Sequence, residues 1–253
     1  MACWCERLNQ ERMERMLAGL SASRYARAAM PDPRFRDLYH RLLDANGPQQ
    51  WWPAESPLEV IVGAFLTQRT AWRNATLAIE ALKRERLLSV EALARVPADH
   101  LRGVIRPAGF VRAKSRALQG FAGHVNERHG GVLRRFLALP TDALREELLS
   151  LFGVGEETAD AILVYAAKRP GFVIDAYTRR LLSRLGWSGG DEPYGQLRDL
   201  FTESLPVDAA LHGELHALIV EHGKRHCRAR PRCEGCPLRS ICAEAERDGT
   251  LGG

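Results

Sequence analysis

The sequence predicts an all-α fold with two helical lobes. Apolar residues recur at helical spacing along most of the 253 residues. The sequence lacks convincing runs of alternating apolar and polar residues, and Pro and Gly separate one helical segment from the next. With 45% apolar and 26% charged residues, the chain has the composition of a globular protein with a sizeable core.

The expected helices follow one another along the chain. The first covers residues 33–45 and ends before Asn46-Gly47-Pro48. Ser56 and Pro57 predict the cap and first turn of a helix over 58–68, which is apolar nearly all round and is therefore expected in the core. Further helices are expected at 71–84, 112–128, 141–151, 156–168, 176–186, 192–203 and 207–224.

Residues 141–168 predict two helices joined by a tight turn. Thr141 is the expected N-cap of the first helix, and Gly153-Val154-Gly155 leads into the second. The two glycines allow positive φ angles, and the bare N–H groups at the start of the second helix suit a phosphate. An ordinary helix-turn-helix corner is the alternative that the two glycines alone leave open.

The charge balance permits a nucleic-acid partner without proving one. Lys and Arg number 36 against 31 Asp and Glu, which gives a net charge of +5, and only four of the basic residues are lysines. Arginine suits bidentate phosphate contacts, although an Arg-rich chain also follows from a genome's base composition. No apolar run approaches 18 residues and no secretory signal is visible, so we expect a cytoplasmic protein that does not enter a membrane.

Four cysteines near the C-terminus predict a metal site in a reducing compartment. Their thiolates suit tetrahedral zinc and an iron–sulfur cluster equally well. Between Glu221 and Cys242 there are six basic residues against two acidic ones, so we expect this loop to face a phosphate backbone. Cys3 and Cys5 lie in an N-terminal extension, 1–30, which we expect to be mobile. The four candidate ligands are Cys227, Cys233, Cys236 and Cys242.

Three motifs in one order resemble the helix-hairpin-helix DNA glycosylases of the endonuclease III superfamily. They are LTQRTAW (66–72), LFGVGEETADAILVYA (151–166) followed by FVIDAYTRRLLSRLG (172–186), and HGKRHCRARPRCEGCPLRSIC (222–242). The resemblance covers about residues 30–243. It implies a base-excision-repair enzyme that acts on double-stranded DNA containing damaged bases. It also implies a [4Fe–4S] cluster on the four cysteines, although the first cysteine interval is one residue shorter than is common.

The resemblance assigns roles to individual residues. Asp175 stands at the position of the catalytic carboxylate, which stabilises positive charge on the sugar and orients or deprotonates water. Capping of the following helix is its other possible role. Gln68 fills the gap left by a flipped base, and Phe110 is a candidate second wedge or a packing residue. The expected DNA contacts are Gln68, Phe110, Gly153, Val154, Gly155, Lys224 and Arg228.

Glu157 separates this chain from the bifunctional members of the superfamily. It occupies the position of their lysine, and a carboxylate cannot form a Schiff base. We therefore expect a monofunctional glycosylase that uses water. Trp51-Trp52-Pro53, Trp72 and Glu157 resemble the base pocket of bacterial 3-methyladenine glycosylases, where electron-poor alkylated purines stack on indole rings. Burial in the core is the alternative for the tryptophans, and the best-known members of that group lack the cysteines.

Two other functions remain open at this stage. One is a bifunctional endonuclease III that acts on oxidised pyrimidines, and the other is a non-catalytic DNA-binding module. We expect a monomer at the nucleoid, with the active site between a central lobe, 56–174, and a second lobe made of 31–55 and 175–253. Asp160 and Asp208 are other candidates for the catalytic carboxylate, but each is expected on a solvated helix face or at a cap.

Overall fold

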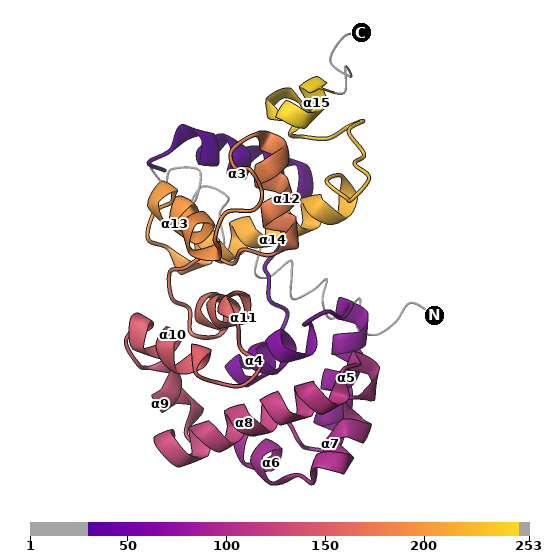
Figure 1. The fold of residues 1–253 in the computed structure, drawn as a ribbon, viewed down its shortest axis with the longest axis vertical. Helices are drawn as coiled ribbons and strands as arrows, with labels where there is room; N and C mark the ends of the chain where they lie inside the picture. Colours follow the sequence, from indigo (N-terminus) through magenta and orange to yellow (C-terminus); the bar gives the residue numbers. More distant parts are fainter. Residues whose placement is uncertain (1–29, 248–253) are drawn as a thin grey trace.

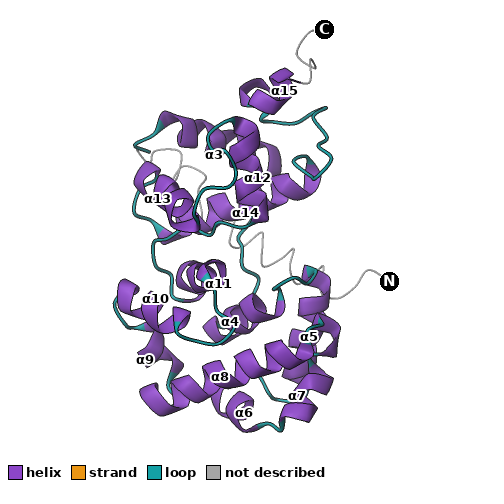
Figure 2. Cartoon of the chain, in the orientation of Figure 1, coloured by secondary structure: helices purple, strands orange, loops and turns teal. Residues whose placement is uncertain are grey.

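The computed structural model describes residues 30–247 (Figure 1). Every regular element in that range is a helix, which confirms the predicted all-α fold (Figure 2). The expected extension 1–30, with Cys3 and Cys5, lies outside the described residues except for Met30. The elements are α3 (Pro33–Asn46), α4 (Pro57–Leu66), α5 (Trp72–Arg84), α6 (Val90–Arg95), α7 (Ala98–Val104), η1 (Arg106–Ala108), α8 (Val111–His129), α9 (Leu133–Leu137), α10 (Thr141–Leu149), α11 (Glu156–Ala161), η2 (Ile162–Ala166), α12 (Ala176–Leu185), α13 (Tyr194–Ser204), α14 (Ala209–Arg225), η3 (Arg239–Ile241) and α15 (Ala243–Arg247).

All the helices expected from the sequence are present, with ends shifted by up to two residues. The short helices α6, α7 and α9 were not expected, because five to seven residues form too few turns for a periodic apolar pattern. The π-helical turn η2 continues α11, so the second helix of the hairpin ends at Ala166 rather than at residue 168.

Helix starts follow the predicted capping in part. The Ser56 hydroxyl accepts a hydrogen bond from the Glu59 N–H at 3.2 Å, so the predicted cap of α4 is confirmed. The predicted cap at Thr141 is wrong, because Pro140 precedes α10 in an extended conformation and Thr141 is already the first helical residue. Asp208 is the N-cap of α14, which is one of the two positions expected for it from the sequence.

Two hydrophobic cores lie at opposite ends of the molecule (Figure 1). The first core is formed by the helices from α4 through α11 together with the π-helical turn η2. The second core is formed by α3, α12, α13 and α14. Val173 packs in the first core, whereas its neighbours Phe172 and Ile174 pack in the second, so the chain crosses between the cores here. Trp51 and Trp52 pack against the first core, although the sequence placed 31–55 with the second lobe.

The hairpin helices α10 and α11 are joined by an ion pair as well as by apolar packing. Arg145 Nε donates to Asp160 Oδ1 at 2.8 Å, and Asp160 is only 1% exposed. The expectation of a solvated or capping Asp160 is therefore wrong, because the facing guanidinium compensates the buried carboxylate. In the described part of the chain, no helix combines the length and the hydropathy that crossing a bilayer requires.

Candidate active site

A cavity of about 310 Å³ draws its walls from both cores. Its lining comes from the segment before α4, from the loop between α4 and α5, and from α11, α12 and α14. Seven residues singled out in the sequence line it together, although they come from five separate stretches of chain. They are Trp51, Trp52, Gln68, Trp72, Glu157, Asp175 and Lys224.

Asp175 lies at the N-terminus of α12 with its carboxylate in this cavity. Its Oδ1 accepts a hydrogen bond from the Thr178 N–H at 2.8 Å, so the side chain caps the helix. Oδ2 lies 3.6 Å from Nε2 of His216. Burial alone would raise the pKa of the Asp175 carboxyl, but His216 and the Thr178 N–H outweigh burial and hold the pKa below its ordinary value. The carboxylate is therefore charged at neutral pH.

Sequence reasoning did not identify the residues behind Asp175. His216 projects from α14, and its Nδ1 lies 2.7 Å from the hydroxyl of Tyr165 in the π turn. The same hydroxyl donates to the Gly213 carbonyl at 3.0 Å. A Cβ on Gly213 would lie 3.1 Å from the Tyr165 ring, so the small residue allows this close approach. No local signal marks either residue, because a histidine or tyrosine on an apolar helix is usually a core residue.

Three tryptophans form one wall of the cavity. The ring centroids of Trp51 and Trp72 are 4.9 Å apart, and Trp52 lies 5.3 Å from Trp72. Lys224 Nζ lies 5.4 Å from the centre of the Trp51 ring, within the range of a cation–π contact. Upstream of this wall, the Glu214 carboxylate accepts the backbone N–H groups of both Gln49 and Gln50, a contact that sequence reasoning missed.

Glu157 of α11 and Gln68 of the loop before α5 also line the cavity. Desolvation and the negative charge of Asp175 raise the pKa of the Glu157 carboxyl, although His216 and Arg179 act in the opposite direction. Gln68 Nε2 donates to the Gly153 carbonyl at 2.8 Å and to the Thr158 hydroxyl at 3.0 Å. The loop before α5 is therefore hydrogen-bonded directly to the hairpin turn.

The hairpin turn uses its two glycines differently. Gly153 has a φ of +80°, as expected, whereas Gly155 has a φ of −99° and an extended backbone. The side chain of Val154 between them is buried in the first core. The turn therefore presents the N-terminus of α11 to solvent while its middle residue anchors it.

Phe110 lies on the surface beside the Gln68 loop. Its side chain is 61% exposed, and it precedes α8 with a left-handed backbone conformation. The buried Lys114 connects the two segments, because its Nζ donates to Leu66 O, Thr70 Oγ1 and Ala108 O at 2.7–2.8 Å. Burial lowers the pKa of Lys114.

Some expected site residues lie outside the cavity. Pro53 is exposed and does not line the cavity, and Arg228 is an exposed residue beside the first cysteine of the C-terminal loop. Lys168, at the far end of the second hairpin helix expected from the sequence, is also exposed and is absent from the cavity wall.

All four cysteines of the C-terminal loop line one small cavity of about 20 Å³. Sulfur ligands of a tetrahedral zinc lie about 3.8 Å apart, given Zn–S bonds of about 2.3 Å. Within residues 30–247, no three of these sulfur atoms come within 4.8 Å of one another. Arg184 donates to Cys227 Sγ at 3.3 Å, which suits a thiolate. The donor set around this cavity is all sulfur, which is the set that holds a [4Fe–4S] cluster.

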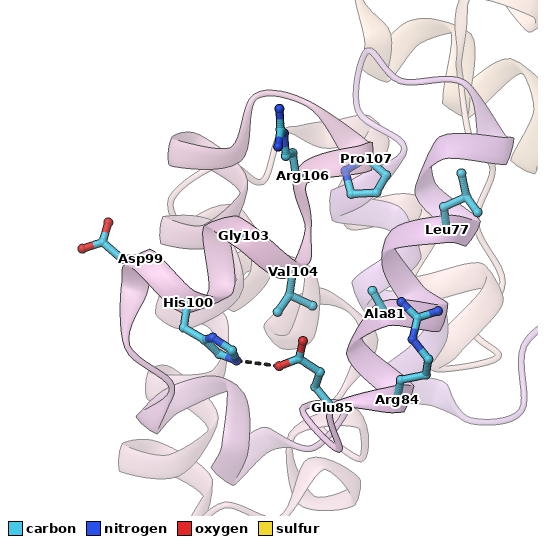
Figure 3. Close-up of a pocket in the computed structure, with 10 residues that line it drawn as sticks. All are labelled: Leu77, Ala81, Arg84, Glu85, Asp99, His100, Gly103, Val104, Arg106 and Pro107. Carbon is cyan, nitrogen blue, oxygen red and sulfur yellow. Dashed lines mark hydrogen bonds and ion pairs between the residues drawn. The ribbon is translucent and has the colours of Figure 1, made fainter.

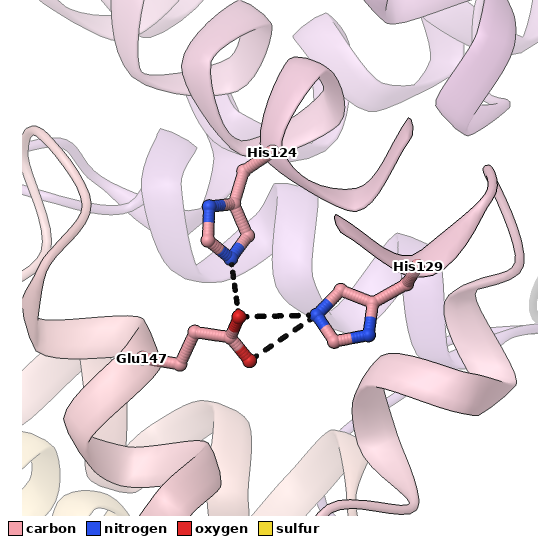
Figure 4. Close-up of side chains that lie close together, drawn as sticks. All are labelled: His124, His129 and Glu147. Atoms are coloured by element: carbon pink, nitrogen blue, oxygen red, sulfur yellow. Dashed lines mark hydrogen bonds and ion pairs between the residues drawn. The ribbon is translucent and has the colours of Figure 1, made fainter. Parts of the chain in front are cut away.

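Two other features lie away from this site. A more open depression of about 920 Å³ between α5 and α7 contains the Glu85–His100 hydrogen bond and none of the motif residues (Figure 3). Glu147 of α10 accepts hydrogen bonds from His124 and His129 of α8 and so joins the two helices (Figure 4).

Known proteins resemble this chain over most of its length. A relative from Methanocaldococcus jannaschii, whose name describes a DNA repair glycosylase, is 45% identical over 206 residues, which are 81% of this chain and 94% of the relative. The fold matches an endonuclease III in a non-covalent DNA complex with a TM-score of 0.72 at 23% identity, over 86% of this chain and 97% of the other.

A second solved structure is an H. pylori 3-methyladenine DNA glycosylase bound to 1,N6-ethenoadenine. It has a TM-score of 0.67 at 27% identity, over 76% of this chain and 97% of the other. Residues 62–207 match the family described as HhH-GPD superfamily base excision DNA repair protein. The chain therefore belongs to the HhH-GPD superfamily, as the three sequence motifs predicted.

Proposed function

We propose that this protein is a monofunctional DNA glycosylase that hydrolyses the N-glycosidic bond of a flipped, alkylated purine. The observation that carries the proposal is the cavity itself, whose lining combines the Asp175 carboxylate with three tryptophans. The names of the H. pylori and M. jannaschii proteins support this choice of activity. The partner is double-stranded DNA with a damaged base, bound by one copy of the protein at the nucleoid.

Asp175 supplies the electrostatic part of the reaction. Breaking the glycosidic bond places positive charge on the deoxyribose, and a fixed carboxylate stabilises that charge most strongly in a partly dry cavity. Its lowered pKa keeps it ionised at neutral pH. The same low basicity makes it a better orienting group than proton acceptor.

Glu157 supports water rather than an amine as the nucleophile. The carboxylate lies on the cavity wall at the position where bifunctional relatives carry their lysine, and no nitrogen nucleophile is available from it. Lys224 also lines the cavity, but its ammonium lies against the Trp51 ring.

The aromatic wall favours a cationic or electron-poor base. Indole faces carry negative quadrupole charge and attract positive rings, so an alkylated purine gains more from stacking here than an oxidised pyrimidine does. The neighbouring carboxylates Asp175 and Glu157 add to this preference for positive charge.

The four cysteines would hold a [4Fe–4S] cluster at the far side of the second core. When bound, such a cluster contributes folding free energy to the loop that carries it. Lys224, which lines the cavity, and the exposed Arg228 both lie at the N-terminal end of this loop. They would contact DNA phosphates on either side of the flipped nucleotide.

A panel of duplexes tests the function. The purified protein should release alkylated purines and leave intact abasic strands that break only after alkali, and borohydride should trap no enzyme–DNA adduct. Oxidised pyrimidine, uracil and mismatched thymine duplexes form the comparison set. Efficient borohydride trapping by the unmodified protein would establish lyase chemistry instead, and binding without release of any base would leave a non-catalytic module.

A further inference from the structure

Three metal-ligating side chains converge between α8 and α10, away from the proposed active site (Figure 4). Nε2 of His124 and Nε2 of His129 lie 2.9 and 3.1 Å from the same oxygen, Oε1 of Glu147. One ligating atom from each of the three side chains lies within 4.8 Å of the other two. None of the three residues lines the cavity that contains Asp175, so the proposed function leaves this cluster unexplained.

The distances within the cluster are close to those around a tetrahedral zinc ion. Zn–N and Zn–O bonds of about 2.0–2.2 Å place two ligand atoms about 3.3–3.5 Å apart. The two nitrogen–oxygen separations fall short of this spacing by only a few tenths of an ångström. Two imidazoles and one carboxylate are also a ligand set that zinc takes, with water as its fourth ligand.

The two imidazole rings are positioned by a shared aromatic neighbour. The fully buried Phe136 ring of α9 makes edge contacts with both, with its centroid 6.0 Å from the His124 ring and 5.2 Å from the His129 ring. Within residues 30–247, neither Nδ1 hydrogen-bonds to another residue. Each neutral ring can therefore carry its proton on Nδ1 and present the lone pair of Nε2 to a metal.

The cluster is accessible to an ion from solvent. Its three side chains are between 11% and 16% exposed, and His124 also lines a depression of about 830 Å³ beside the hairpin residue Phe152. An ion can therefore reach the three ligating atoms without a change in the backbone, and a water molecule in the depression can complete its coordination.

We propose that His124, His129 and Glu147 form a binding site for a divalent metal ion of the kind that imidazole prefers, such as zinc. The two Nε2 atoms and the carboxylate supply three ligands, and water supplies the fourth. The ligands come from α8 and from α10, the first helix of the hairpin, so the ion stabilises the packing of the hairpin and takes no part in base removal.

Arg128 is a positive charge that the ion meets at this site. Its Nε lies 3.4 Å from Oε1 of Glu147, and its side chain is 68% exposed. A guanidinium this exposed can turn into solvent, where its charge is screened. Removal of the charge in Arg128→Gln should therefore tighten metal binding by about two- to fivefold, the scale of one exposed charge pair.

A zinc titration tests the site. Iron and zinc in the purified protein are measured first, so that metal in the cysteine loop is counted separately. Equilibrium dialysis should then show one additional zinc per chain. His124→Gln, His129→Gln and Glu147→Gln should each weaken this binding by at least about tenfold, because even the loss of a group behind a ligand costs that much.

His100→Gln is the matched control. His100 contacts one carboxylate, that of Glu85 at 2.6 Å, and belongs to no group of three ligands in the described part of the chain. Zinc should raise the melting temperature of the unmodified protein and of this control, because an ion that binds only the folded state stabilises it. The melting temperatures of the three ligand variants should not respond to zinc.

Long-range ¹H–¹⁵N spectra of the unmodified protein test the site without any variant, because zinc should shift the Nε2 resonances of His124 and His129. The proposal is overturned if these resonances do not move or if no additional zinc binds. Equal zinc affinity in the unmodified protein and the ligand variants would place the ion elsewhere, and so would an equal loss in His100→Gln. These readouts require no excision activity, so they decide the metal site even if the proposed function fails.

Discussion

Gln68 Nε2 donates a 2.8 Å hydrogen bond to the carbonyl of Gly153, which joins the proposed gap-filling residue to the proposed phosphate-binding turn. Before Gln68 can enter a DNA duplex, this bond and the bond to Thr158 must be exchanged for contacts with DNA. The loop around it is held independently, because Lys114 binds Leu66 and Thr70 on either side. Insertion therefore requires a change in one side chain rather than in the whole loop.

Replacing Gln68 should affect excision more than binding. In Gln68→Ala nothing fills the gap that the flipped base leaves, so single-turnover excision should fall, whereas affinity for undamaged duplex should remain near its original value because phosphate contacts dominate it. Gln196→Ala, at an exposed position of α13, is the matched control. Excision equal to that of the control would remove Gln68 from the mechanism.

The two hairpin glycines should respond differently to alanine. A Cβ on Gly155 meets nothing within 4 Å and its φ is negative, so Gly155→Ala should fold normally. The methyl group should instead keep the backbone N–H groups from phosphate and weaken binding to damaged and undamaged duplex alike. A loss confined to damaged DNA would place the turn at the base pocket.

Gly153→Ala should act on stability. Its φ of +80° is unfavourable for alanine, and the new Cβ would lie 3.1 Å from Ala117 Cβ. We expect a loss of about 1–3 kcal/mol in the free energy of unfolding, which thermal or urea unfolding would measure. If Gly153→Ala and Gly155→Ala had the same free energy of unfolding, the positive φ at Gly153 would not be a requirement of the turn.

Asp175→Asn should abolish most activity and keep the fold. Asparagine can still cap α12, but the loss of the charge should lower excision by about a hundredfold or more. DNA affinity should be unchanged in filter or fluorescence binding, because the phosphate contacts remain. Asp175→Ala should lose the cap as well, at a further cost of about 0.5–2 kcal/mol in unfolding free energy. Substantial activity in the Asn variant would refute the electrostatic role.

Asp175 should also contribute to the pH dependence of stability. Because its pKa is lowered in the folded protein, the unfolded chain binds more protons between the two pKa values. The stability contributed by the ionised group is therefore present above the ordinary value of 3.8 and lost as the pH falls through the folded-state value. Urea unfolding from pH 7 to 3 should show a smaller acid loss in Asp175→Asn than in the unmodified protein. Identical curves would indicate that the carboxyl has its ordinary pKa.

Metal analysis tests the cysteine loop. Protein purified without oxygen should be yellow-brown and contain about four irons per chain, as a cubane cluster on four thiolates requires. Cys236→Ser should lose iron and destabilise the second core, because bound metal contributes folding free energy. One zinc per chain in place of iron would show that the loop is a zinc site.

The sequence by itself determined the helices, the family and the residues that carry its motifs. Helical periodicity and the Ser56-Pro57 start are local patterns, so α4 and the longer helices could be predicted within two residues. Motif spacing likewise identified Asp175, Gln68 and the tryptophans, and the structure places them around one cavity. Short helices such as α6 contain too few residues to show a helical periodicity of apolar positions.

Only the tertiary structure decided what surrounds those residues. His216 reaches Tyr165 across 51 residues of sequence, and Glu214 binds the Gln49 backbone across 165. Asp160 likewise changed from an expected surface residue to a buried one because the facing helix supplies Arg145. A hydrogen-bond partner depends on how helices pack, and packing joins residues whose spacing in the sequence carries no period. The candidate carboxylate was therefore visible in the sequence, whereas the groups that contact it, Thr178 and His216, appeared only in the fold.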